Sequence, residues 1–522
     1  MRLKVSHGLR RNADAGSTKG TAKAVRWVAL SVVCVVVAGA AATAATARTS
    51  IISVTTPKTA PLATALDDPL FQTTQANGAF TKASAAGAAW ARILVQWQDI
   101  APGTLPKTWN QSDPNSPFYK WKTLDATVAA AAKNNVQLFF DIVSPPGWAY
   151  DVKPKGWTGG RPRTSMLANF ARALARRYNG TGHAAVRAYS VWNEPNFNHN
   201  LYPQNSPNPN NTAEGYYRTM VNGVADAVHA VNPLNLVLAG ELAPFKHTST
   251  KTDKNNVIPP LDFMRAMLCI SNTTPAKLTC HTPAKFDVWT HHPYSDTGPY
   301  GHAKAAGGVE LGDLPKMDAL LKTAWKLGAI QTEQGTHLTN PKAVAPPFWV
   351  TEIGWSSKPP NTKGVPMTLE QRWVGESFYQ LWRSGATLGT WFLVQDEKTT
   401  TPFQSGLYLN SPSIANAKSK PLLAPFHMPF VAYLKTGGNV LVWGRDATSS
   451  AQNVTISMKA GSAWKVVATV MSNSYGIFQA TLSVHAKATY SMRASAQGVT
   501  SATFSLTVPP NENLNVTPFP FS

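Results

Sequence analysis

The stretch VRAYSVWNEPN, residues 186–196, begins with a short, largely apolar run and ends in a cluster of polar residues. Its apolar part shows no strict alternation of apolar and polar positions, which is typical of a strand buried on both faces. Six more runs of this kind are found, at residues 90–97, 136–143, 236–239, 286–290, 348–353 and 387–394. The sequence therefore contains seven clear candidates for buried strands.

Amphipathic segments lie between these runs. Residues 164–178 show the pattern best, because Leu167, Phe170, Leu174 and Tyr178 fall on one helical stripe. Comparable segments cover residues 124–133, 213–231, 314–327 and 369–383. Strands that alternate with helices pair in parallel through right-handed crossovers.

An eighth strand, first in the chain, is expected at residues 62–66, just before Asp67-Asp68-Pro69, although this run is short and rich in alanine. Eight β/α units over this length predict an α/β fold, the (β/α)8 TIM barrel. An open, doubly wound sheet is the alternative fold. No Gly-rich phosphate loop follows any of the runs, which favours the barrel.

A chain of 522 residues is longer than a single hydrophobic core usually supports, so a second domain is expected. The composition of the sequence changes near residue 437. Beyond that point short runs rich in Val, Ser and Thr alternate with turns, and Asp446 and Glu512 are the only acids. This pattern predicts a small all-β sandwich after the barrel. The expected organisation is a targeting segment at 1–47, a linker at 48–60, the barrel at 61–436 and the sandwich at 437–522.

The amino-terminal segment has the features of a secretory signal peptide. A basic region ends at Arg26, and an apolar stretch then runs to Ala45-Thr46-Ala47, an A-x-A cleavage pattern. An uncleaved membrane anchor is the alternative, since the stretch is just long enough to span a bilayer. We therefore expect a secreted protein, or a protein anchored at the cell surface if the segment stays attached.

The formal net charge is +21, and +15 remains after residues 1–47, which carry seven basic residues and one acid. The remaining Lys and Arg are scattered singly, without a basic helix face, so nucleic-acid binding is not expected. The charge is interpreted as a property of the surface that serves either solubility or adhesion, for example to an acidic wall polymer. We expect a monomer that contacts a membrane only through its amino-terminal segment.

Three cysteines are present, and Cys34 lies within the targeting segment. Cys269 and Cys280 are separated by a short polar segment, and outside the cell a local disulfide is expected between them. Two free thiols are the alternative. No CxxC motif or Cys/His cluster indicates a metal, and no cofactor is expected.

Polar residues follow the predicted strands at their carboxyl ends, where barrel enzymes build their active sites. Glu194 follows the fourth strand and Glu352 ends the seventh, so two carboxyl groups are expected at one mouth. His292 and Tyr294 follow the sixth strand between them. Two facing carboxyls suit hydrolysis of a glycosidic bond, in which one is protonated and the other ionised.

The motif Asn193-Glu194-Pro195, together with Thr351-Glu352-Ile353-Gly354-Trp355, resembles the retaining glycoside hydrolases of clan A, of the family 39 and family 5 type. The resemblance covers about residues 60–436. It implies a TIM barrel that hydrolyses O-glycosidic bonds in extracellular β-linked oligo- or polysaccharides by double displacement. It also implies that Glu194 is the acid/base and Glu352 the nucleophile.

The resemblance implies substrate-binding or supporting roles for six more residues, Asn193, Arg92, His292, Tyr294, Trp391 and Trp148. Asn193 would contact the sugar 2-hydroxyl, and Arg92 and Tyr294 would support the nucleophile. Trp391 would form the floor of the catalytic subsite, and Trp148 corresponds to an aromatic residue after the third strand. Four other polar residues near strand ends are interpreted as hydrogen-bonded supporting or rim groups: Glu241, Asp141, Asp396 and Asn196.

The alternative function is a non-catalytic carbohydrate-binding or wall-adhesion protein on a barrel scaffold. Barrels that lose catalysis tend to lose a catalytic carboxylate, and this sequence retains both. Transglycosylation is a further alternative, because it uses the same residues. The sequence does not indicate the sugar, the linkage, exo or endo action, or the role of the sandwich.

Overall fold

The computed structural model describes residues 51–55, 60–157, 159–204, 212–244, 256–280, 282–398, 403–448 and 450–506. The predicted targeting segment at 1–47 lies outside these residues. These described residues all belong to one compact unit. None of the helices in the described part of the chain is both long and apolar enough to span a bilayer.

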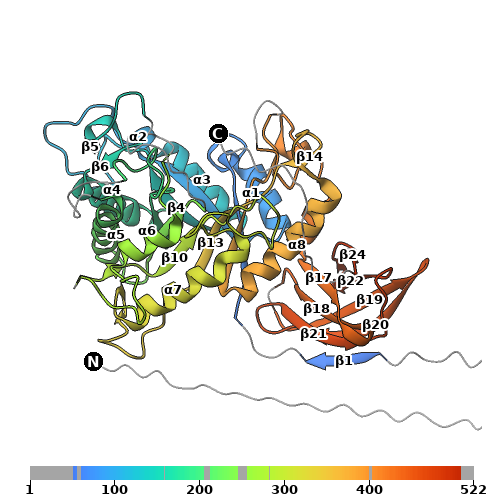
Figure 1. Ribbon diagram of the computed structural model, residues 1–522. Coiled ribbons are helices and arrows are strands. Elements are labelled where there is room, and N and C mark those ends of the chain that lie inside the picture. Colours follow the sequence, from blue (N-terminus) through green and yellow to red (C-terminus); the bar gives the residue numbers. More distant parts are fainter. Residues whose placement is uncertain are drawn as a thin grey trace, which may run out of the picture. The chain divides into compact units, whose positions relative to one another are not determined.

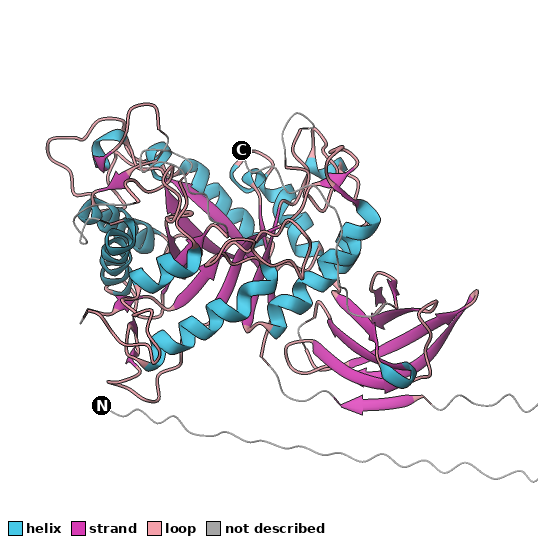
Figure 2. Cartoon of the chain, in the orientation of Figure 1, coloured by secondary structure: helices cyan, strands magenta, loops and turns pink. Residues whose placement is uncertain are grey.

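Eight parallel strands form a closed barrel (Figures 1 and 2). In chain order the strands are β2 (Ala63–Asp67), β3 (Trp90–Gln96), β4 (Gln137–Val143), β7 (Ala188–Val191), β8 (Leu236–Leu242), β10 (Val288–His291), β13 (Phe348–Ile353) and β16 (Ala386–Phe392). Strand β16 pairs with β2 and closes the ring. The predicted TIM barrel is confirmed, and the short alanine-rich run before Asp67 is its first strand.

Helices connect successive barrel strands and lie outside them (Figure 2). They are α1 (Ala76–Ala85), α3 (Lys122–Lys133), α4 (Thr164–Arg177), α5 (Ala213–His229), α6 (Pro260–Met267), α7 (Leu314–Lys326) and α8 (Met367–Arg383). The five predicted helices are among them. In α4 the stripe of Leu167, Phe170 and Leu174 is buried, as its spacing predicts.

The interior of the barrel is layered. One apolar layer takes side chains from the strands at Ala65, Trp90, Phe139, Ala188, Leu238, Val288, Trp349 and Leu388. Because side chains two residues apart share a strand face, the next layer is formed two positions further along. That layer is buried and polar, and contains Asp67, Arg92, Asp141, Ser190, Thr290, Thr351 and Thr390. The polar layer therefore lies directly on an apolar one.

Asp68, the residue after β2, binds the end of the last strand. Its carboxylate Oδ2 accepts hydrogen bonds from the backbone N–H groups of Val394 at 2.8 Å and Gln395 at 3.0 Å. Its Oδ1 accepts a bond from the N–H of Leu70 at 2.7 Å. The first and last strands are thus joined by a side chain as well as by their backbone ladder.

Two further sheets form the β-sandwich (Figure 1). One contains β17 (Phe430–Leu434), β18 (Asn439–Arg445) and β21 (Ile477–Ser483). The other contains β1 (Ile52–Thr55), β20 (Ala463–Met471), β19 (Asn453–Ala460), β22 (Ser491–Ala496), β23 (Val499–Thr500) and β24 (Phe504–Ser505). Strand β17 precedes residue 437, and β1 comes from the predicted linker and pairs with β20. The boundary at 436/437 itself stays a prediction.

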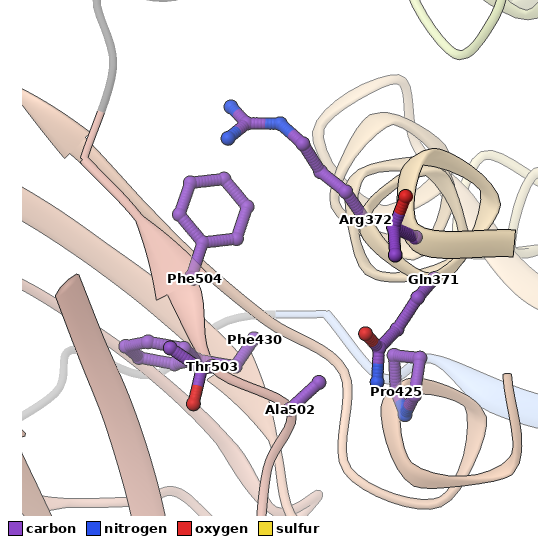
Figure 3. A pocket seen from close by; sticks show the side chains of 8 residues that line it. Gln371, Arg372, Pro425, Phe430, Ala502, Thr503 and Phe504 are labelled. Carbon is purple, nitrogen blue, oxygen red and sulfur yellow. The ribbon is translucent and has the colours of Figure 1, made fainter. Parts of the chain in front are cut away.

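The sandwich contacts the barrel helix α8. The Tyr433 hydroxyl donates to Glu376 Oε1 at 3.2 Å. The Arg372 guanidinium lies 4.1 Å from the ring centre of Phe504 and donates to the Ser505 carbonyl at 3.1 Å (Figure 3). The small cavity lined by Arg372 and Phe504 has a volume of about 30 Å³, room for little more than a water molecule. This interface is packed rather than open.

Cys269 and Cys280 form a disulfide in the structure. Cys269 lies two residues beyond α6, and the bridge closes the short polar segment between the two cysteines. The alternative of two free thiols therefore does not describe this structure.

Candidate active site

Arg92 is the centre of the polar layer. Its fully buried guanidinium contacts four carboxylates, with N···O distances of 2.8 Å to Asp67, 2.6 Å to Asp141 and 3.1 Å to Glu241, and a further short contact to Glu352. Burial alone would lower the pKa of Arg92, but the surrounding carboxylates, Glu352 first among them, raise that pKa well above its usual value. Arg92 therefore keeps its charge and holds five barrel strands together.

The buried carboxyl groups around Arg92 differ in how readily they bind a proton. Burial raises the pKa of Asp67 and of Asp141, although Arg92 opposes the shift. For Glu241 burial is outweighed by Arg92 and His292, which lower its pKa. Protonation of the two aspartates reduces the negative charge that this buried layer must carry.

Glu352 is held by two donors. Tyr294 donates its hydroxyl to Glu352 Oε2 at 2.9 Å, and Arg92 contacts Oε1. The Glu352 side chain is 14% exposed, so a ligand can still reach it. The two donors fix the carboxylate at the end of β13.

Glu194 lies opposite and is bound differently. His292 Nδ1 lies 3.3 Å from Glu194 Oε1 and 3.8 Å from Glu352 Oε2, so one ring nitrogen faces both carboxyl groups. The two oxygens therefore lie no more than about 7 Å apart. The other ring nitrogen, Nε2, lies 2.8 Å from Glu241 Oε2 and anchors the ring. Glu194 is 21% exposed and is also open to a ligand.

Non-glycine residues in the left-handed backbone region gather at this end of the barrel. Ser144 follows β4, Trp192 and Glu194 follow β7, and Glu241 lies near the end of β8, with φ between 45° and 70°. Each such residue costs on the order of 1–3 kcal/mol, and such strain is typical of functional sites. The backbone of Glu194 is held by hydrogen bonds at both its N–H, to Glu241 O, and its C=O, from the N–H of Phe197.

The structure brings the predicted supporting residues together in part. Asn193 joins the site, because its Oδ1 accepts a bond of 2.8 Å from Arg92. Trp148 is partly exposed, and its indole N–H donates to the Pro102 carbonyl at 2.8 Å. Trp391 is fully buried and donates to the Ser405 carbonyl at 2.7 Å. No face of Trp391 is open in this structure, so its predicted contact with a sugar would require the ring to be uncovered.

Two residues interpreted as supporting or rim groups lie outside the site. Asp396 forms a buried ion pair with Lys420 at 2.8 Å and accepts the N–H of Gly406. Asn196 bonds the backbone of Ala243 and Ile258 and fixes the loop after β7. Both residues are structural here.

Asp67 was not among the predicted site residues, because the first strand lacked a clear motif. Its pairing with Arg92 makes it part of the buried ion cluster around that residue. Asp141 and Glu241, which were interpreted as supporting or rim groups, belong to the same cluster. The available signal was its position directly after a predicted strand, the same rule that selected Glu194 and Glu352.

Within the described residues no group of three or more His, Cys, Asp and Glu side chains is arranged to hold a metal ion. The carboxylates of the site are instead directed at Arg92 and His292. Carboxyl groups held in this way can transfer protons and can act as nucleophiles.

Comparison with known proteins gives likenesses of fold. No protein-family model matches the chain, and no curated protein matches its sequence. A family 39 glycoside hydrolase from the gut symbiont Bacteroides cellulosilyticus WH2 is similar at 14% identity and TM-score 0.47, with 82% of each chain covered. The family 39 enzyme from Xanthomonas axonopodis pv. citri is similar at 12% identity and a TM-score of 0.47, with 83% of this chain and 94% of that chain covered. A family 30 endoxylanase from Clostridium papyrosolvens C71 is similar at 12% identity and a TM-score of 0.41, with 83% of this chain and 97% of that chain covered.

Tyr294→Phe removes one donor from Glu352 and keeps the ring. Because a hydrogen bond to a charged group is worth about 1.5–3 kcal/mol, we expect kcat to fall about 10- to 100-fold. Steady-state kinetics will measure this. Tyr189→Phe is the matched control, since that buried hydroxyl donates to the Val186 carbonyl at 2.9 Å. Equal losses of kcat in the two variants would contradict a specific role for Tyr294.

His292 should make stability depend on pH. Burial would lower its pKa, but the charge of Glu352 and the hydrogen bonds to Glu194 and Glu241 raise the pKa to about 10. The protonated ring therefore stabilises the fold fully below the unfolded pKa of 6.5, and this contribution is lost as pH rises through about 10.

We expect His292→Gln to lower the free energy of unfolding by about 2 kcal/mol near pH 6, with a smaller difference from wild type near pH 10. Urea unfolding of both proteins at several pH values will measure the difference. His485→Gln, at an exposed position in the sandwich, is the control. A difference that stays constant from pH 6 to pH 10 would contradict this assignment.

Proposed function

We propose that the protein is a retaining glycoside hydrolase that cleaves β-linked glycans. The observation that carries the proposal is the pair Glu194 and Glu352, which face one nitrogen of His292 at 3.3 and 3.8 Å and are both partly exposed. A buried structural ion pair would not leave two carboxyl groups open to solvent at the carboxyl ends of barrel strands.

The separation of the two groups is compatible with double displacement. Retaining enzymes place their carboxyl groups about 5–5.5 Å apart, and inverting enzymes about 6.5–9.5 Å apart. The limit of about 7 Å between Glu194 Oε1 and Glu352 Oε2 admits the retaining separation.

The surroundings of the two groups favour one assignment of roles. Glu352, bound by Arg92 and Tyr294, suits the nucleophile, because donors stabilise an attacking carboxylate. Its oxygen attacks the anomeric carbon while Glu194 gives a proton to the departing oxygen and the glycosidic bond breaks. In the second step Glu194 takes a proton from water, the water oxygen attacks the anomeric carbon, and Glu352 leaves as a carboxylate.

His292 can serve both steps without moving. When the proton shared by Nδ1 and Glu194 lies on the carboxyl group, Nε2 keeps its own proton and donates to Glu241, and Nδ1 accepts a hydrogen bond from protonated Glu194. When both nitrogens are protonated, Nδ1 donates to ionised Glu194, the form that activates water. The bond to Glu241 fixes the ring in each case.

The proposal is tested with a panel of chromogenic β-glycosides and dyed polysaccharides, followed by proton NMR of the first sugar released. Release of sugar with the β-anomer formed first is the expected result. An α-anomer formed first would contradict the retaining mechanism. Glycan binding without any release would favour the binding-protein alternative, and formation of longer products at high substrate concentration would indicate transglycosylation.

We further propose that the protein acts outside the cell. The basic and apolar segment that ends in Ala45-Thr46-Ala47 supports this, and it lies outside the described residues. Amino-terminal sequencing of protein recovered from the culture medium is expected to begin at Arg48. Protein that remains in the membrane fraction with residues 1–47 attached would indicate an anchor instead.

A further inference from the structure

The β-sandwich has a flat sheet face that carries unpaired positive charge. In the sheet of β20, β19 and β22, the residues that alternate inward, such as Val454 and Ile456, are buried against the other sheet. The opposite face, which we call the outer face, carries Lys459, Trp464 and Arg493. In Figure 1 these strands belong to the red sandwich domain.

The strand register brings these three side chains together. Lys459 is directly opposite Trp464 on β20 and opposite Ser491 on β22. Arg493 is opposite Ser457, two residues before Lys459, so the two cations lie diagonally across neighbouring strands. Small hydroxyl side chains, Ser457 and Ser491, occupy the positions between them.

Within the described part of the sandwich, no acidic side chain lies on the outer face. Asp446 is the only acidic residue in residues 430–506, and it is buried. Lys459 and Arg493 are partly exposed, and the Nε atom of Arg493, which is itself buried, has no hydrogen-bond partner among the described residues. Like charges held close together without acids destabilise a sheet unless an external anion compensates for them.

Trp464 gives this charged face a flat aromatic surface. The Arg493 guanidinium lies 4.2 Å from the centre of the Trp464 ring, a cation–π contact that orients its N–H donors. An oriented guanidinium binds a carboxylate through two parallel hydrogen bonds. Trp464 is itself partly exposed, and the face of an indole stacks on the carbon face of a sugar ring.

We propose that the outer face of the sandwich binds an acidic, carboxylate-bearing polysaccharide. Arg493 would bind the carboxylate of one sugar residue, and Lys459 would bind the carboxylate of a neighbouring sugar residue. Trp464 would contact the sugar ring between them. The chain would thereby be held on an acidic glycan while the barrel acts on its substrate. The choice of a polysaccharide over another polyanion rests on the proposed function, since the same chain carries a candidate glycosidase site.

The test compares binding of the full protein to polygalacturonate and to the same polymer fully methyl-esterified, at low ionic strength. Wild type is expected to bind the acid form and not the ester, because the ester lacks the charges. Lys459→Gln/Arg493→Gln should weaken binding about tenfold or more, with an effect that shrinks at high salt. Trp464→Ala should also weaken it.

Lys435→Gln/Lys487→Gln is the matched control, because it removes the same charge from exposed positions elsewhere in the sandwich. We expect less than about a twofold change in affinity for it. Equal losses in the two double variants, equal binding of the ester, or equally strong competition by double-stranded DNA would each overturn the proposal. Thermal unfolding of every variant shows whether it is folded.

Polygalacturonate is α-linked and is therefore not a substrate of the proposed β-glycosidase. Binding without hydrolysis of any β-glycoside would leave the outer-face site standing while the proposed function fails. Hydrolysis by wild type together with failure to bind polygalacturonate would remove the site and leave the enzyme.

Discussion

Glu352→Gln is expected to lower kcat on a β-glycoside by about 10⁴-fold or more, because an amide cannot attack the anomeric carbon. Asp67 and Asp141 cannot replace it, since both are buried beneath Arg92, whereas Glu352 is partly exposed. Steady-state kinetics with an aryl glycoside will measure the loss. Glu333→Gln, whose carboxylate lies 3.2 Å from His229 Nδ1 outside the site, is the control and should retain activity.

Glu194→Gln distinguishes the two roles. General acid catalysis raises the rate of a reaction by about 10²–10⁴-fold. A leaving group that can depart without a proton gains little from it. A dinitrophenyl glycoside should therefore still form the glycosyl-enzyme rapidly in Glu194→Gln, whereas a nitrophenyl or sugar leaving group should not. A burst of dinitrophenol followed by slow turnover is expected. Equal losses for all leaving groups, or an active Glu352→Gln variant, would contradict the assignment.

Arg92→Met is expected to lower the free energy of unfolding by about 3–5 kcal/mol and to abolish activity, because it leaves buried carboxylates without their cation. Asp67, Asp141 and Glu241 would then lie without their cation in an almost fully buried space. Urea unfolding will measure the change. The loss of stability should shrink as the pH is lowered, because burial already favours the protonated forms of Asp67 and Asp141.

Arg161→Met is the matched control. Arg161 pairs with Asp151 at 2.7 Å, but Asp151 is 46% exposed, and exposed pairs contribute only about 0–1 kcal/mol. A similar loss of stability in the two variants would mean that the ion cluster around Arg92 does not support the fold.

The barrel could be predicted because strands buried on both faces leave unbroken apolar runs in the sequence. The same logic located Glu194 and Glu352, since polar residues that follow such runs gather at one mouth. Even the weak first strand, a short alanine-rich run, was placed correctly. Its small side chain at Ala65 lies in a layer with bulky Trp349 and Phe139, so alanine there reflects packing and not a loop.

What the sequence left open depends on side-chain contacts. Trp391 at a strand end cannot be distinguished by pattern from an exposed tryptophan, and its burial follows from packing on Trp355 at a ring distance of 5.9 Å. Asp396 pairs with Lys420, far along the chain. Strand β1 pairs with β20 across more than four hundred residues, and no local signal indicates such a partner.

The bond from Asp68 to the ends of β16 has a consequence for the order of events during synthesis. The residues that complete the site come from early and late parts of the barrel sequence, because Asp67 ends the first strand and Glu352 lies on the seventh. A nascent chain halted before β16 lacks the strand that pairs with β2. The carboxylates around Arg92 would then be present, but the barrel that encloses them would still be open. The proposed activity is therefore expected only after the ribosome has finished nearly the entire barrel, and its onset would report closure of the barrel.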